Sequence, residues 1–157
     1  MILVVMGVSG SGKTTVAEKL AQRLGCEFIE GDDFHPAENV AKMRSGTPLG
    51  DADRWPWLRR LNEELRKRKN AVLACSALKQ SYRDLLARDI PDCRFVFLNP
   101  AIEVLRSRVA GRRHRYMPAS LLESQRAALE PPRHAIEVDV SGSAEESVEE
   151  IVRQLDA

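Results

Sequence analysis

The sequence predicts an α/β fold of the doubly wound kind, a parallel sheet with helices on both faces, and three observations support it. Short apolar runs alternate with longer stretches of helical periodicity, which is the layout of successive βαβ units. Several runs are apolar or β-branched throughout, as strands covered on both faces are. The first run leads directly into a glycine-rich turn and a helical pattern. A length of 157 residues suffices for one such domain with its own core.

The elements follow one another in the order that this fold requires. Residues 2–6 are a continuous apolar run of strand length, and residues 13–24 carry apolar side chains at helical spacing. Gly25 is placed to end that helix. The later runs and periodic stretches alternate in the same way. We expect strands at residues 2–6, 27–30, 71–75, 94–98 and 135–138, and helices at residues 13–24, 37–45, 53–68, 79–88, 101–109, 119–128 and 144–155.

The composition is that of an ordinary soluble globular protein, with 43% hydrophobic and 30% charged residues. A formal net charge of +1 argues against a general nucleic-acid-binding surface. Cys26, Cys75 and Cys93 are odd in number and lack C-x-x-C spacing, so neither a disulfide framework nor a zinc site is indicated. The first apolar run is too short to span a membrane. We therefore expect a cytoplasmic protein without nucleic-acid or membrane partners.

Residues 7–14 read GVSGSGKT and match the phosphate-binding pattern G-x-x-x-x-G-K-[ST] without a mismatch. Small residues let successive backbone N–H groups turn inward around a phosphate, and the lysine places a cation on the β and γ oxygens. The Thr14 hydroxyl is a candidate Mg²⁺ ligand. The alternative is an ordinary glycine-rich turn. We expect a bound nucleoside triphosphate, contacted by Gly7, Val8, Ser9, Gly10, Ser11, Gly12, Lys13, Thr14 and Thr15.

The segment after the second predicted strand brings carboxylates to the sheet edge where α/β proteins bind ligands. Phosphoryl transfer to an alcohol needs a group that orients the hydroxyl and accepts its proton, and Asp32 is our candidate for that role. The same carboxylate is placed to help hold hydrated Mg²⁺. Alternatively, Asp32 or Asp33 caps the following helix. His35 is either a neighbour of the reacting group or a polar packing residue.

Longer segments carry a more specific resemblance. Residues 31–58 read GDDFHPAENVAKMRSGTPLGDADRWPWL, residues 75–86 read CSALKQSYRDLL and residues 124–132 read SQRAALEPP. With the phosphate loop (P-loop), they make the chain resemble the gluconokinase family of P-loop sugar-acid kinases nearly from end to end. The resemblance implies that ATP phosphorylates D-gluconate on its terminal hydroxyl, giving 6-phospho-D-gluconate. It also implies one P-loop kinase domain over residues 1–157, similar to nucleoside monophosphate kinases and shikimate kinase, and it suggests a homodimer.

An anionic polyol such as gluconate calls for cations that pair with its carboxylate and for polar groups that bind its hydroxyls. On the family-like segments we place Arg54, Lys79 and Arg83 around the sugar acid, with Asp32 and His35 near its reacting end. For Arg54 the alternative is a structural ion pair with one of the two nearby aspartates. The two tryptophans of the same segment either pack the entrance of a helix or stack on the substrate.

A strongly basic stretch, residues 106–115, reads RSRVAGRRHR in a chain whose charges otherwise balance. In kinases of the architecture that the resemblance implies, a lid closes over ATP and its arginines neutralise the transferring phosphoryl group. The resemblance implies a lid segment at residues 106–118, in which Arg108 and Arg112 contact the nucleotide. It also implies that Arg112 is a catalytic residue, as Lys13 is. A solvated basic face or an RNA-contacting strip is the alternative.

No aspartate ends the third predicted strand. We therefore expect Thr14, the ATP phosphates and water to hold Mg²⁺, with Asp32 or Ser76 in the surroundings. Cys75 is expected to be a buried apolar residue rather than a nucleophile. Two other functions stay open on the sequence: a kinase for another small acid or polyol such as shikimate, and a nucleotide-gated regulatory module.

Overall fold

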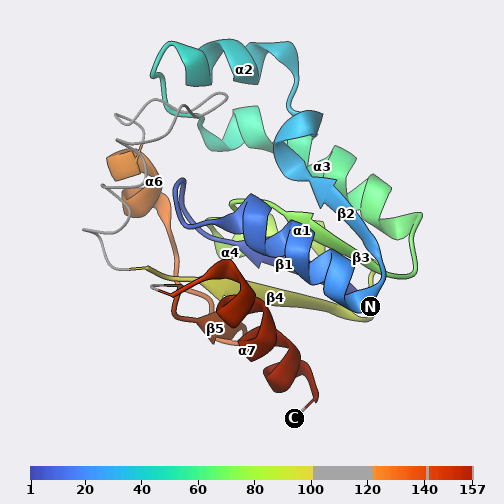
Figure 1. Ribbon diagram of the computed structural model, residues 1–157. Coiled ribbons are helices and arrows are strands. Elements are labelled where there is room, and N and C mark those ends of the chain that lie inside the picture. The colour runs from blue at the N-terminus through green and yellow to red at the C-terminus, as the bar shows by residue number, and fades with distance from the viewer. Residues whose placement is uncertain (101–121, 141, 157) are drawn as a thin grey trace.

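A computed structural model describes residues 1–100, 122–140 and 142–156 of the chain, and a parallel sheet forms its centre (Figure 1). The sheet has five strands in the order β2-β3-β1-β4-β5, and each neighbouring pair is parallel. The prediction of a five-stranded parallel sheet is confirmed, with every strand boundary within one residue. The strands are β1 (Ile2–Met6), β2 (Glu27–Glu30), β3 (Ala71–Ala74), β4 (Cys93–Leu98) and β5 (Ile136–Val138).

β1 is the central strand, with both edges paired and both faces covered. It pairs with β3 on one side and β4 on the other, and all its residues are buried. An unbroken apolar run is the sequence that such a position requires. The carboxyl end of β1 therefore lies in the middle of the sheet edge, and the phosphate loop starts there.

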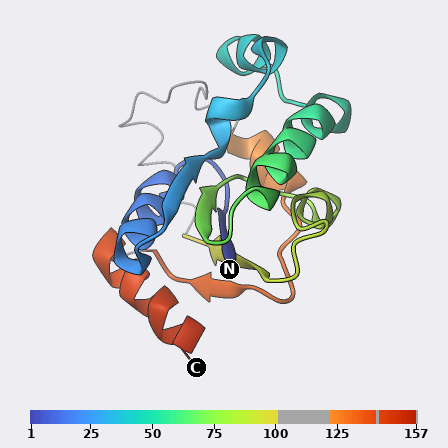
Figure 2. The same cartoon turned by 90° about the vertical axis from the view of Figure 1, so that its right-hand side faces the viewer.

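Helices cover both faces of the sheet, which gives the three layers seen in Figure 1 and Figure 2. α1 (Lys13–Leu24) and α7 (Ala144–Asp156) pack on one face, and α3 (Asp51–Arg66) and α4 (Gln80–Leu86) pack on the other. Because side chains alternate along each strand, the sheet contributes to two apolar cores, one under each helical layer. The predicted doubly wound α/β architecture is thereby confirmed.

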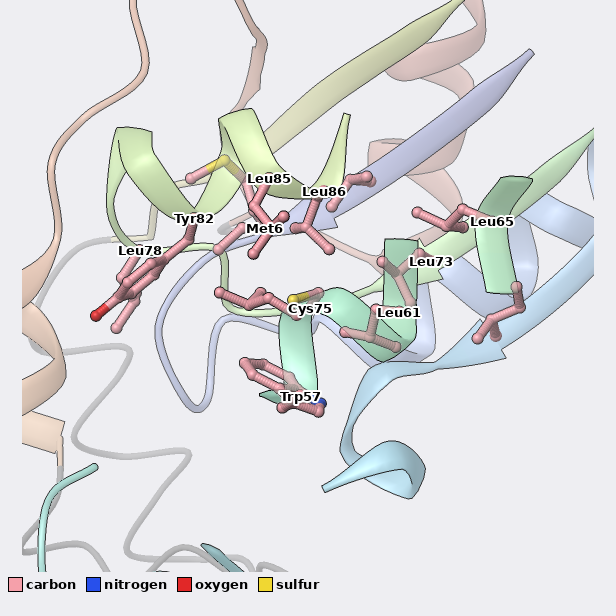
Figure 3. Packing of buried hydrophobic residues seen from close by; sticks show 14 of the residues in the cluster. Met6, Trp57, Leu61, Leu65, Leu73, Cys75, Leu78, Tyr82, Leu85 and Leu86 are labelled. Atoms are coloured by element: carbon pink, nitrogen blue, oxygen red, sulfur yellow. The ribbon is translucent and has the colours of Figure 1, made fainter. Parts of the chain in front are cut away.

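The core beneath α3 and α4 contains two large aromatic side chains (Figure 3). Trp57 of α3 and Tyr82 of α4 are almost wholly buried there, together with Met6 of β1. Each aromatic ring keeps one polar group, and a buried polar group needs a partner. The Trp57 indole N–H donates to the Gly31 carbonyl at 2.8 Å, and the Tyr82 hydroxyl donates to the Asp51 carboxylate. The core is thus tied directly to the carboxyl edge of the sheet.

Three more helices are described: η1 (Gly31–Phe34), a short 3₁₀ turn that was not predicted, α2 (Ala37–Arg44) and α6 (Leu122–Ala128). α3 begins two residues before the predicted helix because the Asp53 carboxylate accepts a hydrogen bond from the Gly50 N–H at 2.9 Å. The helix expected at residues 101–109 lies outside the described residues. Of the helices that the structure describes, none is both long and apolar enough to cross a bilayer.

Candidate active site

The phosphate loop connects β1 to the N-terminus of α1 in a conformation that depends on its glycines. Gly10 and Gly12 have φ angles of 84° and 93°, and Gly12 turns the chain into the helix. At Gly7 a Cβ atom would lie 2.8 Å from the Ser11 hydroxyl oxygen and 2.9 Å from the Leu98 carbonyl oxygen. The first turn of α1 contains no acidic residue, and the positive dipole end of a helix favours an anion.

Lys13 opens α1, and its side chain folds back over the loop. Its ammonium group donates to the Val8 carbonyl at 3.2 Å. Burial lowers the pKa of Lys13, while the negative charges of Asp32 and Glu30 act in the opposite direction. The acidic end of β2 therefore lies close enough to the loop lysine for their charges to interact.

Thr14, the predicted Mg²⁺ ligand, meets a carboxylate that was not predicted. Its hydroxyl donates to Glu30 Oε2 at 2.5 Å, and Glu30 Oε1 accepts from the backbone N–H of Asp32 at 3.3 Å. Burial raises the pKa of Glu30, with the Thr14 hydrogen bond acting against it. Hydroxyl and carboxylate oxygens are the hard ligands that Mg²⁺ prefers, so this pair fits the ion or its water shell. The feature of the sequence that could have identified Glu30 is its charge at the last position of β2.

Asp32 lies in η1, and three contacts hold this turn against the sheet. Glu30 caps it, Trp57 donates to its first carbonyl, and a Cβ atom on Gly31 would lie 2.5 Å from the Ala74 carbonyl oxygen. The last contact requires glycine because the turn presses on the end of β3. The residue that caps α2 is Pro36, without a side-chain hydrogen bond. The alternative in which Asp32 or Asp33 caps that helix is therefore wrong.

His35 packs beneath Asp32. Its ring stacks on Trp57 with 4.0 Å between centroids, its Nδ1 lies 3.2 Å from Asn39 Nδ2, and its Nε2 lies 3.6 Å from Asp32 Oδ1. Burial, with a smaller contribution from the charge of Arg54, lowers the pKa of His35 to about 4. The His35 side chain is only 3% exposed. This differs from the expected substrate contact, because the ring reaches the site through Asp32 and not through a surface of its own.

Arg54 and Tyr82 approach the site from the α3 and α4 side. The Arg54 guanidinium donates to the Leu49 carbonyl at 2.6 Å and to the Tyr82 hydroxyl at 3.3 Å. The nearby aspartates pair with other cations: Asp51 with Lys79, and Asp53 with a lysine of α2. The structural ion pair that the sequence left open for Arg54 is thus replaced by contacts to a carbonyl and a phenol.

Lys79 lies at the start of α4, and its ammonium group is 3.0 Å from Asp51 Oδ1. The Tyr82 hydroxyl donates to the same carboxylate oxygen. The hydrogen bond from Tyr82, followed by the one from Lys79, lowers the pKa of Asp51. The sequence identified Lys79 but not Tyr82, whose pattern is that of a core aromatic. The four side chains, Arg54, Lys79, Asp51 and Tyr82, form what we call the acceptor cluster.

Arg83 requires a correction. Its side chain is 2% exposed, and its guanidinium donates to the carbonyls of Ala77 at 2.7 Å, Leu78 at 3.2 Å and Glu130 at 2.8 Å. Expected to bind the substrate, it instead holds the loop between β3 and α4 against the segment after α6. Lys79 extends from the end of this loop, so Arg83 supports the acceptor cluster from behind.

Ser9 also differs from its expected role in part. Its backbone N–H donates to Gln125 Oε1 at 2.7 Å, so that N–H is directed to α6 and not to a phosphate. Cys75 is buried, and burial raises the pKa of its thiol to about 12, which agrees with the expected packing role. Arg108, Arg112 and the whole predicted lid segment, residues 106–118, lie outside the described residues.

Comparisons with known proteins give relatives that match nearly the whole chain. A family model described as an AAA domain matches residues 2–132. The gluconokinase of Gluconobacter oxydans is 49% identical to this chain over 162 residues, covering 99% of this chain and 91% of that protein. A solved gluconokinase from Sinorhizobium meliloti has a TM-score of 0.90 at 47% identity, covering 98% of this chain and 90% of that one. The shikimate kinase of Aquifex aeolicus, with a TM-score of 0.67 at 21% identity, shares the fold.

Proposed function

The chain belongs to the gluconokinase family of P-loop kinases, and we propose that it transfers the γ-phosphoryl group of ATP to the terminal hydroxyl of D-gluconate. The product is 6-phospho-D-gluconate. The observation that carries the proposal is that Glu30 accepts hydrogen bonds from the Thr14 hydroxyl, at the phosphate loop, and from the backbone N–H of Asp32, which brings Asp32 close to the loop. In a kinase the acceptor hydroxyl must lie next to the γ-phosphate, and a carboxylate beside the phosphate loop is in position to bind that hydroxyl.

The reaction is a direct in-line transfer. Asp32 orients the terminal hydroxyl of gluconate and accepts its proton as the oxygen attacks the γ-phosphorus. The bond from the γ-phosphorus to the bridging oxygen breaks, and ADP leaves with that electron pair. Lys13 and the N-terminus of α1 neutralise the negative charge on the phosphates. No covalent intermediate on the enzyme is needed.

Thr14 and Glu30 are the residues that would hold Mg²⁺, directly or through its water. When bound, the ion screens the charge of the phosphates and fixes their orientation. The Thr14 hydroxyl keeps Glu30 turned toward the loop, and Glu30 in turn receives the Asp32 N–H. The same carboxylate therefore links the metal side of the site to the proton-accepting side.

The acceptor cluster supplies the groups that a sugar acid needs. In our proposal Arg54 and Lys79 pair with the gluconate carboxylate, while Asp51 and the Tyr82 hydroxyl bind its hydroxyl groups; the mutual contacts of these four side chains support the assignment. On sequence grounds alone we extend the proposal to Arg108 and Arg112 as phosphate-binding residues of a lid over ATP, and to residues 1–157 as one kinase domain.

A coupled assay for ADP release tests the function. Adding D-gluconate to the protein with ATP and Mg²⁺ should accelerate ADP release, and 6-phospho-D-gluconate should appear in equal amount. A panel with shikimate and other small acids distinguishes a different kinase, which would respond to one of them and not to gluconate. A regulatory module would bind ATP yet release no additional ADP with any acceptor.

A further inference from the structure

A chain of polar contacts runs from Asn39 through His35 to Asp32. Asn39 Nδ2 lies 3.2 Å from His35 Nδ1, and His35 Nε2 lies 3.6 Å from Asp32 Oδ1. We propose that Asn39 is a positioning residue: its amide keeps the ring proton of His35 on Nε2, and that N–H holds the Asp32 carboxylate in its reactive orientation. The inference rests on the proposed function only in the role given to Asp32.

The orientation of the Asn39 amide follows from its second contact. Asn39 is 2% exposed, and its Nδ2 donates to the backbone carbonyl of Asp53 at 2.8 Å. A carbonyl only accepts, so the amide nitrogen, and not the amide oxygen, must face Asp53. An NH₂ group has two hydrogens, and the second is left for His35. Both contacts are therefore satisfied by one orientation of the amide, and rotating it by 180° would lose both.

The tautomer of His35 follows from the amide. Because Asn39 donates to Nδ1, this ring nitrogen must carry a lone pair, and the single proton of a neutral imidazole is on Nε2. At 3.6 Å the Nε2–H group and the Asp32 carboxylate attract each other electrostatically without forming a direct hydrogen bond. In the other tautomer an Nε2 lone pair would face the carboxylate and repel it.

The ring itself has little freedom to turn. It stacks on Trp57 with an interplanar angle of 19°, and the same indole donates to the carbonyl of Gly31, one residue before Asp32. One tryptophan thus anchors both the histidine ring and the turn that carries the carboxylate. With the ring fixed, the position of its proton decides whether the ring attracts or repels the Asp32 carboxylate, and Asn39 controls that position.

Nitrogen-15 NMR of the histidine ring tests the first half of the proposal without substrate or activity. In the native protein at about pH 9, where neutral imidazole predominates, the His35 spectrum should show a protonated Nε2 and an unprotonated Nδ1. A protonated Nδ1 would overturn the proposal. This outcome is separate from the gluconokinase assay, because the ring can be observed whether or not gluconate is phosphorylated.

Asn39→Asp tests the second half of the proposal, that the Nε2–H group of His35 holds the Asp32 carboxylate in its reactive orientation. The carboxylate has no hydrogen to donate, so the ring proton should move to Nδ1 and the Nε2 lone pair should face Asp32. We expect kcat at about pH 9 to fall on the order of tenfold, a part of what a positioned base contributes, with KM for ATP unchanged. The matched control is Asn62→Asp, which makes the same change at a buried asparagine whose Nδ2 donates to Leu86 and Arg88 carbonyls. It should lower stability and leave kcat and the His35 spectrum as they are.

A His35→Gln background separates the proposed path from a general structural effect. A glutamine amide at this position carries its own N–H groups, so its donation to Asp32 does not depend on a tautomer. Asn39→Asp should then lower kcat by a much smaller factor than in the native background. Equal factors in both backgrounds would overturn the proposal. If Asn39→Asp does not fold, Asn39→Ala replaces it: the share of Nδ1-protonated ring should rise, and an unchanged spectrum overturns the proposal.

Discussion

The side-chain carbonyl of Gln125 accepts a buried hydrogen bond from the backbone N–H of Ser9 at 2.7 Å. Ser9 belongs to the phosphate loop, and Gln125 lies 116 residues later in the sequence, on α6. A buried N–H needs an acceptor, and here the acceptor comes from outside the loop. The shape of the loop therefore depends on a helix that follows the predicted lid segment in the sequence.

Replacing Gln125 by leucine should weaken ATP binding. The Ser9 N–H would lose its acceptor, at a cost of about 1–3 kcal/mol, and the loop would no longer be held ready for phosphate. We expect the Kd for ATP, measured by calorimetry, to rise roughly tenfold. Arg126→Leu, at the exposed neighbouring position, is the control and should leave the Kd unchanged. If Gln125→Leu and Arg126→Leu had the same Kd for ATP, the hydrogen bond between Ser9 and Gln125 would not contribute to nucleotide binding by the loop.

Asp32→Asn should abolish most turnover while ATP still binds. The amide keeps the size of the side chain and loses the ability to accept a proton, so kcat should fall by at least about a hundredfold. The adjacent Asp33→Asn makes the same change on the exposed side of the turn and should retain nearly full activity. Turnover of Asp32→Asn at the native rate would remove Asp32 from the chemistry.

Lys79→Met should raise KM for gluconate and leave KM for ATP unchanged. A charge-assisted bond to the substrate carboxylate is worth about 1.5–3 kcal/mol, which corresponds to a rise on the order of tenfold or more. Stability should change little, because the ion pair of Lys79 with Asp51 is largely solvated, with side chains 31% and 50% exposed.

Arg83→Met provides the contrast to Lys79→Met. Three backbone carbonyls would lose the guanidinium, so urea denaturation should show a loss of at least about 2 kcal/mol in the free energy of unfolding. A pattern in which Arg83→Met leaves stability intact and raises KM for gluconate would restore Arg83 to the substrate site.

The sequence was sufficient for the fold because the signals were local. β1 is an unbroken apolar run, and α1 lies between Gly12 and Gly25, both in left-handed conformations that glycine favours. α3 was misplaced by two residues because its cap is made by Asp53 reaching back to Gly50, a contact that looks in sequence like a helix starting at Asp53.

The site was only partly predictable because several roles depend on contacts between distant segments. Glu30 belongs to the site because it accepts a hydrogen bond from Thr14, and Gln125 because it accepts one from Ser9. The sequence around Glu30 or Gln125 does not reveal these distant partners. Arg83 shows the opposite error: an arginine in a substrate-like segment was expected to face the substrate, yet its acceptor at Glu130 lies 47 residues later. The sequence shows which residues are charged, and the packing of the folded chain decides which of these side chains reach the site.

Glu30→Gln should raise the Mg²⁺ concentration that gives half-maximal activity. The amide keeps one acceptor oxygen for Thr14 but removes the negative charge that favours a divalent cation near the loop. The assay varies Mg²⁺ at fixed ATP, and Glu27→Gln, at the exposed start of β2, is the control. An unchanged Mg²⁺ dependence in Glu30→Gln would exclude Glu30 from the metal surroundings.

His35 makes the stability of the native protein depend on pH. Its pKa is about 4 in the folded chain because burial disfavours the imidazolium, whereas the ordinary value is 6.5. Since the folded pKa is depressed, the contribution of His35 to stability is complete above pH 6.5. As the pH falls toward 4, His35 becomes protonated in the unfolded chain but stays largely neutral in the folded chain, and its contribution to stability is lost.

The free energy of unfolding should therefore fall more steeply between pH 6.5 and 4 in the native protein than in His35→Gln. The two curves should differ in their total change by at most about 3 kcal/mol, the free energy that corresponds to the shift in pKa. Carboxylates also titrate at the acid end, but most are common to both proteins and cancel in the difference. Urea denaturation at several pH values measures both curves. Parallel curves would mean that the imidazole accepts its proton as easily in the folded chain as in the unfolded one, against the burial and the stacking on Trp57.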